Sequence, residues 1–156
     1  MNRIYCAIGK IVEVTQNIEL DIGDIVEQSE IIKEFSRHAK MSSLDLKQVQ
    51  EDASYLKEKM TSMTFGQMIG IVYESKSLSF DEINELKALL EKRNYFTHEY
   101  FKVTKFLVSN AEQFIVEEFE ALKEYLAKLK KMLSRLEIIK ENNNNRIVYL
   151  KNKNNI

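Results

Sequence analysis

Hydrophobic residues recur at helical spacing through the first quarter of the chain. Over residues 3–36 an apolar side chain returns every three or four positions, as in an amphipathic helix. The members of this stripe are Ile4, Ile8, Ile11, Val12, Ile18, Ile22, Ile25 and Val26. Gly23 lies within the stripe, and glycine is a weak helix former. The pattern predicts a long first helix, either continuous or bent or divided at Gly23.

A second apolar stripe follows a pair of serines. Ser42 and Ser43 are both candidate N-caps, because a serine hydroxyl can accept a hydrogen bond from an unpaired backbone N–H of the first helical turn. The stripe consists of Leu44, Leu46, Val49, Ala53, Leu56 and Met60. We therefore predict a second helix that begins at these serines.

Three later positions carry a capping box, in which a Ser or Thr and a Glu or Gln three residues on cap each other's backbone N–H. The boxes are Thr64–Gln67, Ser79–Glu82 and Ser109–Glu112. Apolar pairs in staple position flank the first two boxes, namely Met63 with Met68 and Leu78 with Ile83. These signals predict a short helix over residues 65–75, an unbroken helix over residues 79–108, and a last helix that begins at the third box.

The last helix carries a heptad pattern. Its apolar residues alternate steps of four and three, and they are Ile115, Phe119, Leu122, Leu126, Leu129, Leu133 and Leu136. Such a seam packs against another helix, either inside the same bundle or on a second copy, and we favour internal packing. The run Glu141–Asn145 predicts the helix end, because asparagine is a poor helix former. The chain then divides into a helical-bundle domain over residues 1–141 and an Asn/Lys-rich tail over residues 142–156.

The composition agrees with an all-α fold. The chain has 156 residues, 44% of them hydrophobic, with four glycines and no proline. This length supports one domain with a core. An all-β sandwich or barrel needs far more turn-forming residues. We predict an all-α, up-and-down bundle of about five helices with a long C-terminal helix.

Cysteine and histidine usage restricts the compartment and the chemistry. Cys6 is the only cysteine, so an internal disulfide is impossible and a cytoplasmic location is expected. No apolar run approaches the roughly 20 residues of a membrane span. The two histidines, His38 and His98, belong to no zinc or di-iron pattern. We expect no metal, no cofactor and no membrane partner.

Positive charge is concentrated at the C-terminal end. Residues 121–156 hold nine Lys/Arg and three Asp/Glu, a balance of +6, although the whole chain has a net charge of −1. A basic end suits a polyanion such as nucleic acid. An ordinary solvated helix face has the same composition, and we favour that interpretation.

One segment inside the predicted 79–108 helix is rich in chemically capable side chains. On a helix of about 100° per residue, Asn94 and His98 share one stripe, while Arg93, Thr97 and Tyr100 share the next. Arg93 and His98 are five residues apart, which places them about 140° apart around a straight helix. A local bend, or a two-fold partner that presents the same helix, would bring the two side chains together. The spacing therefore indicates a site at a dimer interface.

Residues 93–100 read Arg-Asn-Tyr-Phe-Thr-His-Glu-Tyr, or R-N-x-x-x-H-x-Y. This segment resembles the signature of the HEPN superfamily of nucleotide-binding helical domains. With the tyrosine two residues after the histidine, Tyr100, the motif resembles that of the HEPN toxins that are paired with a minimal nucleotidyltransferase. It is also similar to the motif of uncharacterised bacterial helical proteins. The resemblance covers about residues 79–101. Thr97 departs from the pattern, which commonly has a small apolar residue there.

The resemblance implies a homodimer through residues 79–108 and, in many members, ribonuclease activity without a metal. RNA and a nucleotidyltransferase-type antitoxin are the implied partners. By position, Arg93 would bind the scissile phosphate, His98 would be the general acid/base, and Asn94 would orient His98 or the substrate. Tyr100 would line the site. These roles suit the residues, since arginine binds phosphate in a bidentate manner and histidine transfers protons near neutral pH.

A second interpretation needs no catalysis. Several HEPN relatives have lost activity and act as binding or dimerisation modules. Arg93 and His98 would then form a polar pair that fixes helix packing. The sequence leaves open an RNA-binding or RNA-cleaving protein, possibly the effector of a bacterial defence pair, and a non-catalytic helical interaction module.

Overall fold

A computed structural model describes residues 2–100 and 111–156, and all regular secondary structure in these ranges is helical. The elements are α1 (Asn2–Arg37), α2 (Ser43–Thr61), α3 (Phe65–Ser75), α4 (Phe80–Asn94), the π-helical turn η1 (Tyr95–Glu99) and α6 (Ala111–Asn154). The predicted all-α bundle with a long C-terminal helix is confirmed.

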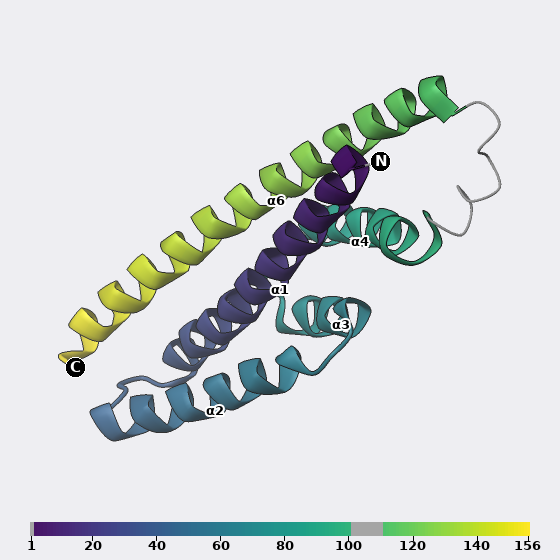
Figure 1. Cartoon of the computed structure of the whole chain (residues 1–156). Helices are drawn as coiled ribbons and strands as arrows, with labels where there is room; N and C mark the ends of the chain where they lie inside the picture. The colour runs from purple at the N-terminus through teal and green to yellow at the C-terminus, as the bar shows by residue number, and fades with distance from the viewer. Residues whose placement is uncertain (1, 101–110) are drawn as a thin grey trace.

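The first helix is the centre of the arrangement. α1 contacts α6, α2, α3, α4 and η1. α6 runs beside α1 in the same direction, whereas α2 returns antiparallel to α1 on the other side (Figure 1). α1 is continuous through Gly23, so the glycine does not divide it. The shorter helices and the candidate site are therefore attached to one long, uninterrupted helix.

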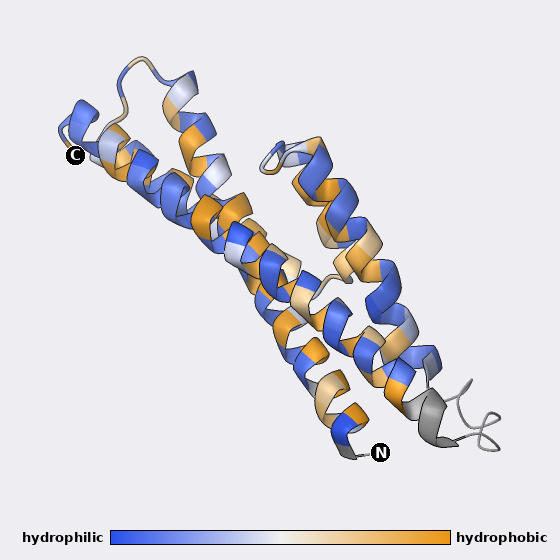
Figure 2. Cartoon of the chain, turned by 90° about the horizontal axis from the view of Figure 1, so that it is seen from above, coloured by the Kyte–Doolittle hydropathy of each residue, from blue (hydrophilic) through white to orange (hydrophobic). Residues whose placement is uncertain are grey.

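The core consists of two clusters of buried side chains. The larger one joins α1, α3, α4, η1 and α6 with the end of α2, and its fully buried members include Ile11, Ile18, Ile22, Leu86 and Leu122. The smaller one closes the far end, where α1 ends and α2 begins; its buried members are Ile31, Ile32, Phe35, Met41, Leu46, Ala53 and Ile147. Hydrophilic and hydrophobic residues alternate along the long helices (Figure 2), as expected for helices with one apolar face.

Helix starts follow the predicted caps. The backbone N–H of Gln67 donates to Thr64 Oγ1 at 3.3 Å, and that of Glu82 donates to Ser79 Oγ at 3.3 Å. Both boxes are reciprocal. Ser42 is the N-cap of α2 and forms a further box with Asp45. The third predicted box, Ser109–Glu112, lies outside the described residues.

The heptad face of α6 packs internally, as favoured from the sequence. Its most deeply buried residues are Leu122, Tyr125, Leu129, Met132 and Leu136, and this face lies against α1. Three other members of the predicted seam are only partly buried at its edge, namely Phe119, Leu126 and Leu133. The centre of the seam is thus rotated to include Tyr125 and Met132. The side chain of Ile115 lies outside the described residues.

The predicted end of the last helix at residue 141 is wrong. α6 continues through the asparagine run to Asn154. Ile147 is 7% exposed within the smaller core cluster, and the backbone N–H of Met41 donates to Asn154 Oδ1 at 3.0 Å. Tertiary packing of this kind outweighs the weak helix propensity of asparagine. Residues 142–154 are therefore the last turns of α6 and pack against the rest of the bundle.

A charged network connects the three longest helices. Lys140 of α6 binds Asp21 of α1 and lies 3.3 Å from Asp24. Lys57 of α2 lies 2.6 Å from the same Asp24 and 3.2 Å from Glu27. Asp21 is buried, so the ammonium of Lys140 offsets the cost of burying its charge. The network fixes α6 and α2 to the middle of α1.

The predicted unbroken helix over residues 79–108 is also corrected. α4 is α-helical as far as Asn94, and the chain then changes to the π-helical turn η1 over Tyr95–Glu99. Residues 101–108 lie outside the described residues. No helix within residues 2–100 or 111–156 combines the length and apolar character needed to cross a membrane.

Candidate functional site

The π-helical turn lies directly between Arg93 and His98. The backbone N–H of Tyr100 donates to the carbonyl of Tyr95, five residues earlier. The hydroxyl of Thr97 donates to the carbonyl of Arg93 at 2.9 Å, at the entry to the turn. An extra residue in one turn brings side chains five apart towards the same face, whereas an α-helix separates them by about 140°. A π-helical turn at this place makes the angular separation of Arg93 and His98 smaller than in a straight α-helix, although Arg93 faces Glu19 of α1 and His98 is exposed to solvent.

Arg93 is turned towards α1. Its Nη2 lies 3.9 Å from Glu19 Oε1, and its Nη1 donates to Asn94 Oδ1 at 3.3 Å. The side chains of Arg93 and Glu19 are 26% and 28% exposed. Arg93 Nε is buried and has no hydrogen-bond partner among the described residues. The two Nη groups, with one hydrogen bond at 3.3 Å and one ion pair at 3.9 Å, therefore keep donor capacity for an anion.

Glu19 is a site residue that the sequence did not reveal. It lies on α1, more than seventy residues before Arg93, and no motif marks it. Partial burial raises the pKa of the Glu19 carboxyl, and the positive charge of Arg93 partly offsets this by lowering the pKa. Only the packing of α4 and η1 against α1 brings the two side chains together.

His98 and Asn94 lie at the surface. Both side chains are exposed, so a ligand can reach them from solvent. Within the described residues the polar contacts of Arg93 are with Glu19 and Asn94 and do not include His98. The structure therefore joins Arg93 to Asn94. His98 lies within η1, and its side chain is exposed to solvent.

Tyr100 is a core residue in this structure. It is 2% exposed, and its ring packs against Tyr95 at 6.4 Å and Phe96 at 6.0 Å between ring centroids. Burial raises the pKa of Tyr100 to about 12, and the charge of Glu118 adds to this rise. A role for Tyr100 in lining the site stays a prediction, and it requires the hydroxyl to become accessible.

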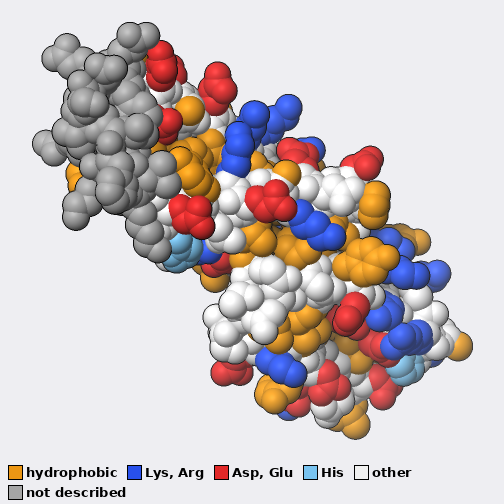
Figure 3. Space-filling model, turned by 90° about the vertical axis from the view of Figure 1, so that its right-hand side faces the viewer, with side chains coloured by type: hydrophobic (Ala, Val, Ile, Leu, Met, Phe, Trp, Pro, Cys, Tyr) orange, Lys and Arg blue, Asp and Glu red, His pale blue; other side chains and the backbone are white. Residues whose placement is uncertain are grey.

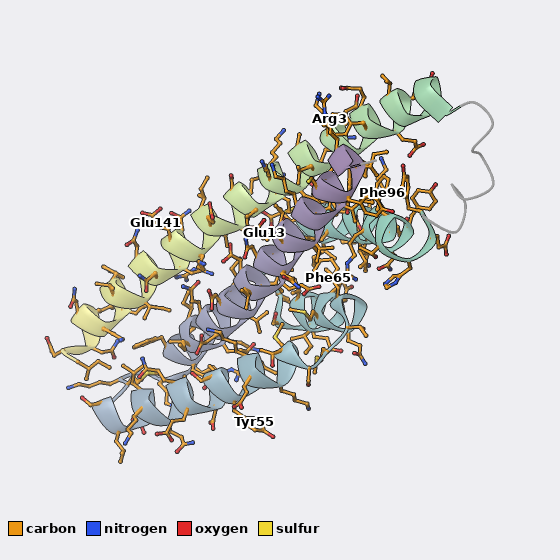
Figure 4. The ribbon with its side chains drawn as sticks, viewed as in Figure 1. Arg3, Glu13, Tyr55, Phe65, Phe96 and Glu141 are labelled. Carbon is orange, nitrogen blue, oxygen red and sulfur yellow. The ribbon has the colours of Figure 1, made fainter. Side chains whose placement is uncertain are left out.

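Aromatic packing anchors the π-helical turn. The ring of Phe96 lies 5.3 Å from that of Tyr125 on α6, and the Tyr125 hydroxyl donates to the carbonyl of Leu89 at 2.6 Å. In Figure 4, Phe96 lies beside the N-terminal half of α1. Phe65, the first residue of α3, lies beside α1 farther towards its C-terminal end. The turn is thus held by α1 and α6 together, which fixes the direction of the neighbouring Arg93.

A pocket opens next to Glu19. It has a volume of about 320 Å³ and lies between α1, the end of α2 and the start of α3. Its lining residues are Gln16, Glu19, Leu20, Gly23, Lys57, Met60, Thr61, Met63 and Met68. Glu19 belongs both to this pocket and to the ion pair with Arg93. The candidate site therefore extends from the π-helical turn into an apolar hollow.

One face of the molecule is mixed in character. Figure 3 shows hydrophobic side chains among acidic and basic ones on the face that it draws.

At the basic C-terminal end, Arg135 binds Glu85 of α4 and so is not available as an unpaired phosphate contact. Within the described residues no three His, Cys, Asp or Glu side chains gather as metal ligands do.

Comparison with known proteins gives no match. No protein-family model, no curated protein and no solved structure matches the chain. The likeness of residues 93–100 to the HEPN signature therefore remains a likeness of one motif. Any functional conclusion depends on Arg93, His98 and the side chains around them.

Proposed function

We propose that this protein is a HEPN-like RNA-binding protein that cleaves RNA without a metal ion, with Arg93 and His98 as its catalytic residues. The single observation that supports the proposal is the π-helical turn over residues 95–99. Single π-helical turns within α-helices occur frequently at functional sites. This one occupies the five residues where Arg93 and His98 need a departure from α-helical geometry.

The chemistry divides between the two residues. The 2′-hydroxyl of the RNA attacks the adjacent phosphorus, the bond to the 5′-oxygen breaks, and a 2′,3′-cyclic phosphate and a 5′-hydroxyl end are released. His98 removes the proton of the attacking hydroxyl and afterwards returns a proton to the leaving oxygen. The guanidinium of Arg93 stabilises the negative charge that builds up on the phosphoryl oxygens.

Arg93 must leave Glu19 to hold a phosphate. The ion pair spans 3.9 Å, beyond hydrogen-bond distance, and both side chains are about a quarter exposed. Because no hydrogen bond joins the two groups, the exchange of the carboxylate for a phosphate breaks only a Coulombic contact. Asn94, bound to Arg93 at 3.3 Å, would steer the guanidinium during that exchange.

The remaining parts of the proposal follow from the motif. We place the protein in the cytoplasm as a homodimer that pairs through residues 79–108. As a toxin or effector of a bacterial defence pair, it would be controlled by a nucleotidyltransferase-type antitoxin, with Tyr100 as the target. That modification requires Tyr100, now 2% exposed, to become accessible.

The test is cleavage of a single-stranded RNA by purified protein in the presence of a chelator. Arg93→Ala and His98→Ala are each expected to reduce the cleavage rate by about 10²-fold or more, as for loss of an acid/base or charge-stabilising group. His38→Ala, which removes the other histidine, is the matched control and should cleave normally. Cleavage that survives both site substitutions would refute the mechanism.

A second candidate function is a non-catalytic interaction module. The observation in its favour is the Arg93–Glu19 ion pair, which joins the π-helical turn to α1 as a structural contact would. In that case Arg93→Ala and Glu19→Ala should both lower the thermal midpoint or weaken dimerisation, and the wild-type protein should show no RNA cleavage.

A further inference from the structure

The pocket beside Glu19, the ion-pair partner of Arg93, has the shape and lining of a small-ligand site. Its floor is formed by Met60 and Met68, which are 1% and 4% exposed, and Leu20 stands at its rim with 60% of its surface exposed. Met63 and Gly23 complete the apolar wall. A volume of about 320 Å³ lies at the small end of the range for ligand pockets. It suits a flat ring system better than a polymer segment.

Most polar groups around the pocket are already engaged. The ammonium of Lys57 lies 2.6 Å from Asp24 and 3.2 Å from Glu27, so only its aliphatic stem faces the hollow. The hydroxyl of Thr61 donates to the carbonyl of Glu58 at 2.7 Å. The carboxylate of Glu19 and the exposed amide of Gln16 remain as the groups that can recognise a ligand.

We propose that this pocket binds a guanine base of the RNA, next to the phosphate held by Arg93. This inference rests on the proposed function and specifies its substrate. Guanine presents two N–H donors, N1–H and the N2 amino group, on one edge, and a carboxylate accepts both. The other bases offer a single donor position there. The thioethers of Met60, Met63 and Met68 are polarizable and make favourable contacts with aromatic rings.

Glu19 connects the binding of the base to the binding of the phosphate. It lies at the edge of the pocket and 3.9 Å from Arg93 Nη2. When a nucleotide enters, Arg93 leaves Glu19 and binds the phosphate. Glu19 then accepts hydrogen bonds from the base. Both charged side chains therefore keep a partner, which avoids the cost of an unpaired polar group. A nucleotide with guanine beside the scissile phosphate satisfies both at once.

The methionines allow a direct test by nuclear magnetic resonance. In protein labelled with ¹³C at the methionine methyl groups, guanosine is added as the probe. We expect saturable shifts of the Met60, Met63 and Met68 signals, caused by the ring current of the base. Met41 and Met132 are fully buried outside the pocket and serve as internal controls. Adenosine, cytidine and uridine are expected to give much smaller shifts at the same concentration.

Two variants test the site independently. Glu19→Gln keeps the size of the side chain and should weaken guanosine binding about tenfold, since a charged acceptor is lost. Gly23→Leu fills the hollow, because a Cβ at Gly23 meets only Lys57 Cγ at 3.5 Å, an ordinary contact. Gly9→Leu is the matched control on the same helix, where a Cβ meets nothing within 4 Å. It should bind guanosine normally.

The outcomes separate this inference from the proposed function. Guanosine binding at the pocket methionines without RNA cleavage would support the pocket and refute the enzyme. RNA cleavage without any shift of Met60, Met63 and Met68 would refute the pocket and leave the enzyme standing. Equal binding of all four nucleosides, or unchanged guanosine binding in both Glu19→Gln and Gly23→Leu, would overturn the guanine assignment.

Discussion

At the scale of single residues, Arg93 is held differently from Lys57 and Lys140, the two cations of the charged network. Lys140 and Lys57 each lie within hydrogen-bond distance of two carboxylates. Arg93 lies 3.9 Å from its one carboxylate and keeps a buried Nε without a partner among the described residues. A guanidinium with one hydrogen bond to Asn94 and an ion pair of 3.9 Å can move to an incoming anion more easily than these two ammonium groups can.

Buried tyrosines should determine the alkaline limit of stability. Burial raises the pKa of Tyr100 to about 12 and raises the pKa of Tyr125 further. A folded-state pKa above the unfolded value means that the stabilisation is complete below about pH 10 and is lost as the pH rises through the folded value. We therefore expect the free energy of unfolding, measured in urea from about pH 8 to pH 12, to fall steadily above pH 10.

The variant Tyr125→Phe isolates one part of this decline. It removes the hydrogen bond to the Leu89 carbonyl, which should cost about 1 kcal/mol near pH 8. Its stability should nevertheless fall less steeply above pH 10, because one ionising group is gone. Lys57 and Lys140, whose pKa values are raised by their carboxylate partners, lose stabilisation in the same range in both proteins. An identical slope for the variant would contradict the assignment.

At the scale of elements, the starts of α2, α3 and α4 could be predicted, as could the ends of α1 and α3, whereas the ends of α4 and α6 could not. Thr64 and Ser79 cap their helices through residues three positions away, so a short sequence window contains all the information. The end of α6 depends on Ile147, which packs with Met41 and other residues about one hundred positions away. No local signal reports that contact, and the asparagine run alone pointed to an earlier end.

The π-helical turn could not be predicted for the same reason, because tertiary contacts determine it. The spacing of Arg93 and His98 showed that a straight helix separates them, but it did not show which irregularity would occur. The turn is fixed by Phe96 and Tyr100, which both enter the core, and Phe96 packs on Tyr125 of α6. These contacts are tertiary, as is the contact that supplies Glu19. Arg93 and His98 were thus singled out from the sequence, whereas the contact of Arg93 with Glu19 became visible only in the fold.

The last turns of α6 should behave as a packed helix. Ile147→Ala is expected to lower the free energy of unfolding by about 2–5 kcal/mol, because it leaves a cavity in the smaller core cluster. Asn142→Ala and Asn145→Ala, at exposed positions within the helix, should each raise it by about 0.5 kcal/mol through helix propensity. Urea unfolding followed by circular dichroism measures both.

Val148→Ala is the matched control for Ile147→Ala. Val148 is the next residue on the same helix and is exposed, so its loss should change the stability by less than about 0.5 kcal/mol. If Ile147→Ala were as mild as Val148→Ala, residues 142–154 would be a loose tail after all.

At the scale of the whole molecule, two turns of α1 organise both stability and the candidate site. Asp21 and Asp24 bind Lys140 of α6, and Asp24 also binds Lys57 of α2. Glu19 and Gly23, on the same stretch of helix, belong to the pocket. The site is therefore built on the stretch of α1 that the charged network joins to both α2 and α6, which favours a pre-organised arrangement.

The proposed homodimer makes a distinct prediction about where the active site lies. In one chain Arg93 is turned towards Glu19 while His98 is exposed on the outer side of the turn. Two motif helices related by a two-fold axis would set Arg93 opposite His98 of the partner subunit. Each dimer would then contain two equivalent sites, each made of Arg93 from one chain and His98 from the other.

Mixing two inactive variants tests this arrangement. In a heterodimer of Arg93→Ala and His98→Ala chains, one composite site keeps both residues and the other has neither. The heterodimer, isolated through two different affinity tags, should therefore regain about half the activity of the wild-type dimer. Sites contained within single chains would all be defective in the heterodimer, so it would stay inactive. A chain that remains monomeric in analytical ultracentrifugation while cleaving RNA would refute the shared site, since His98 would then act with Arg93 of its own turn.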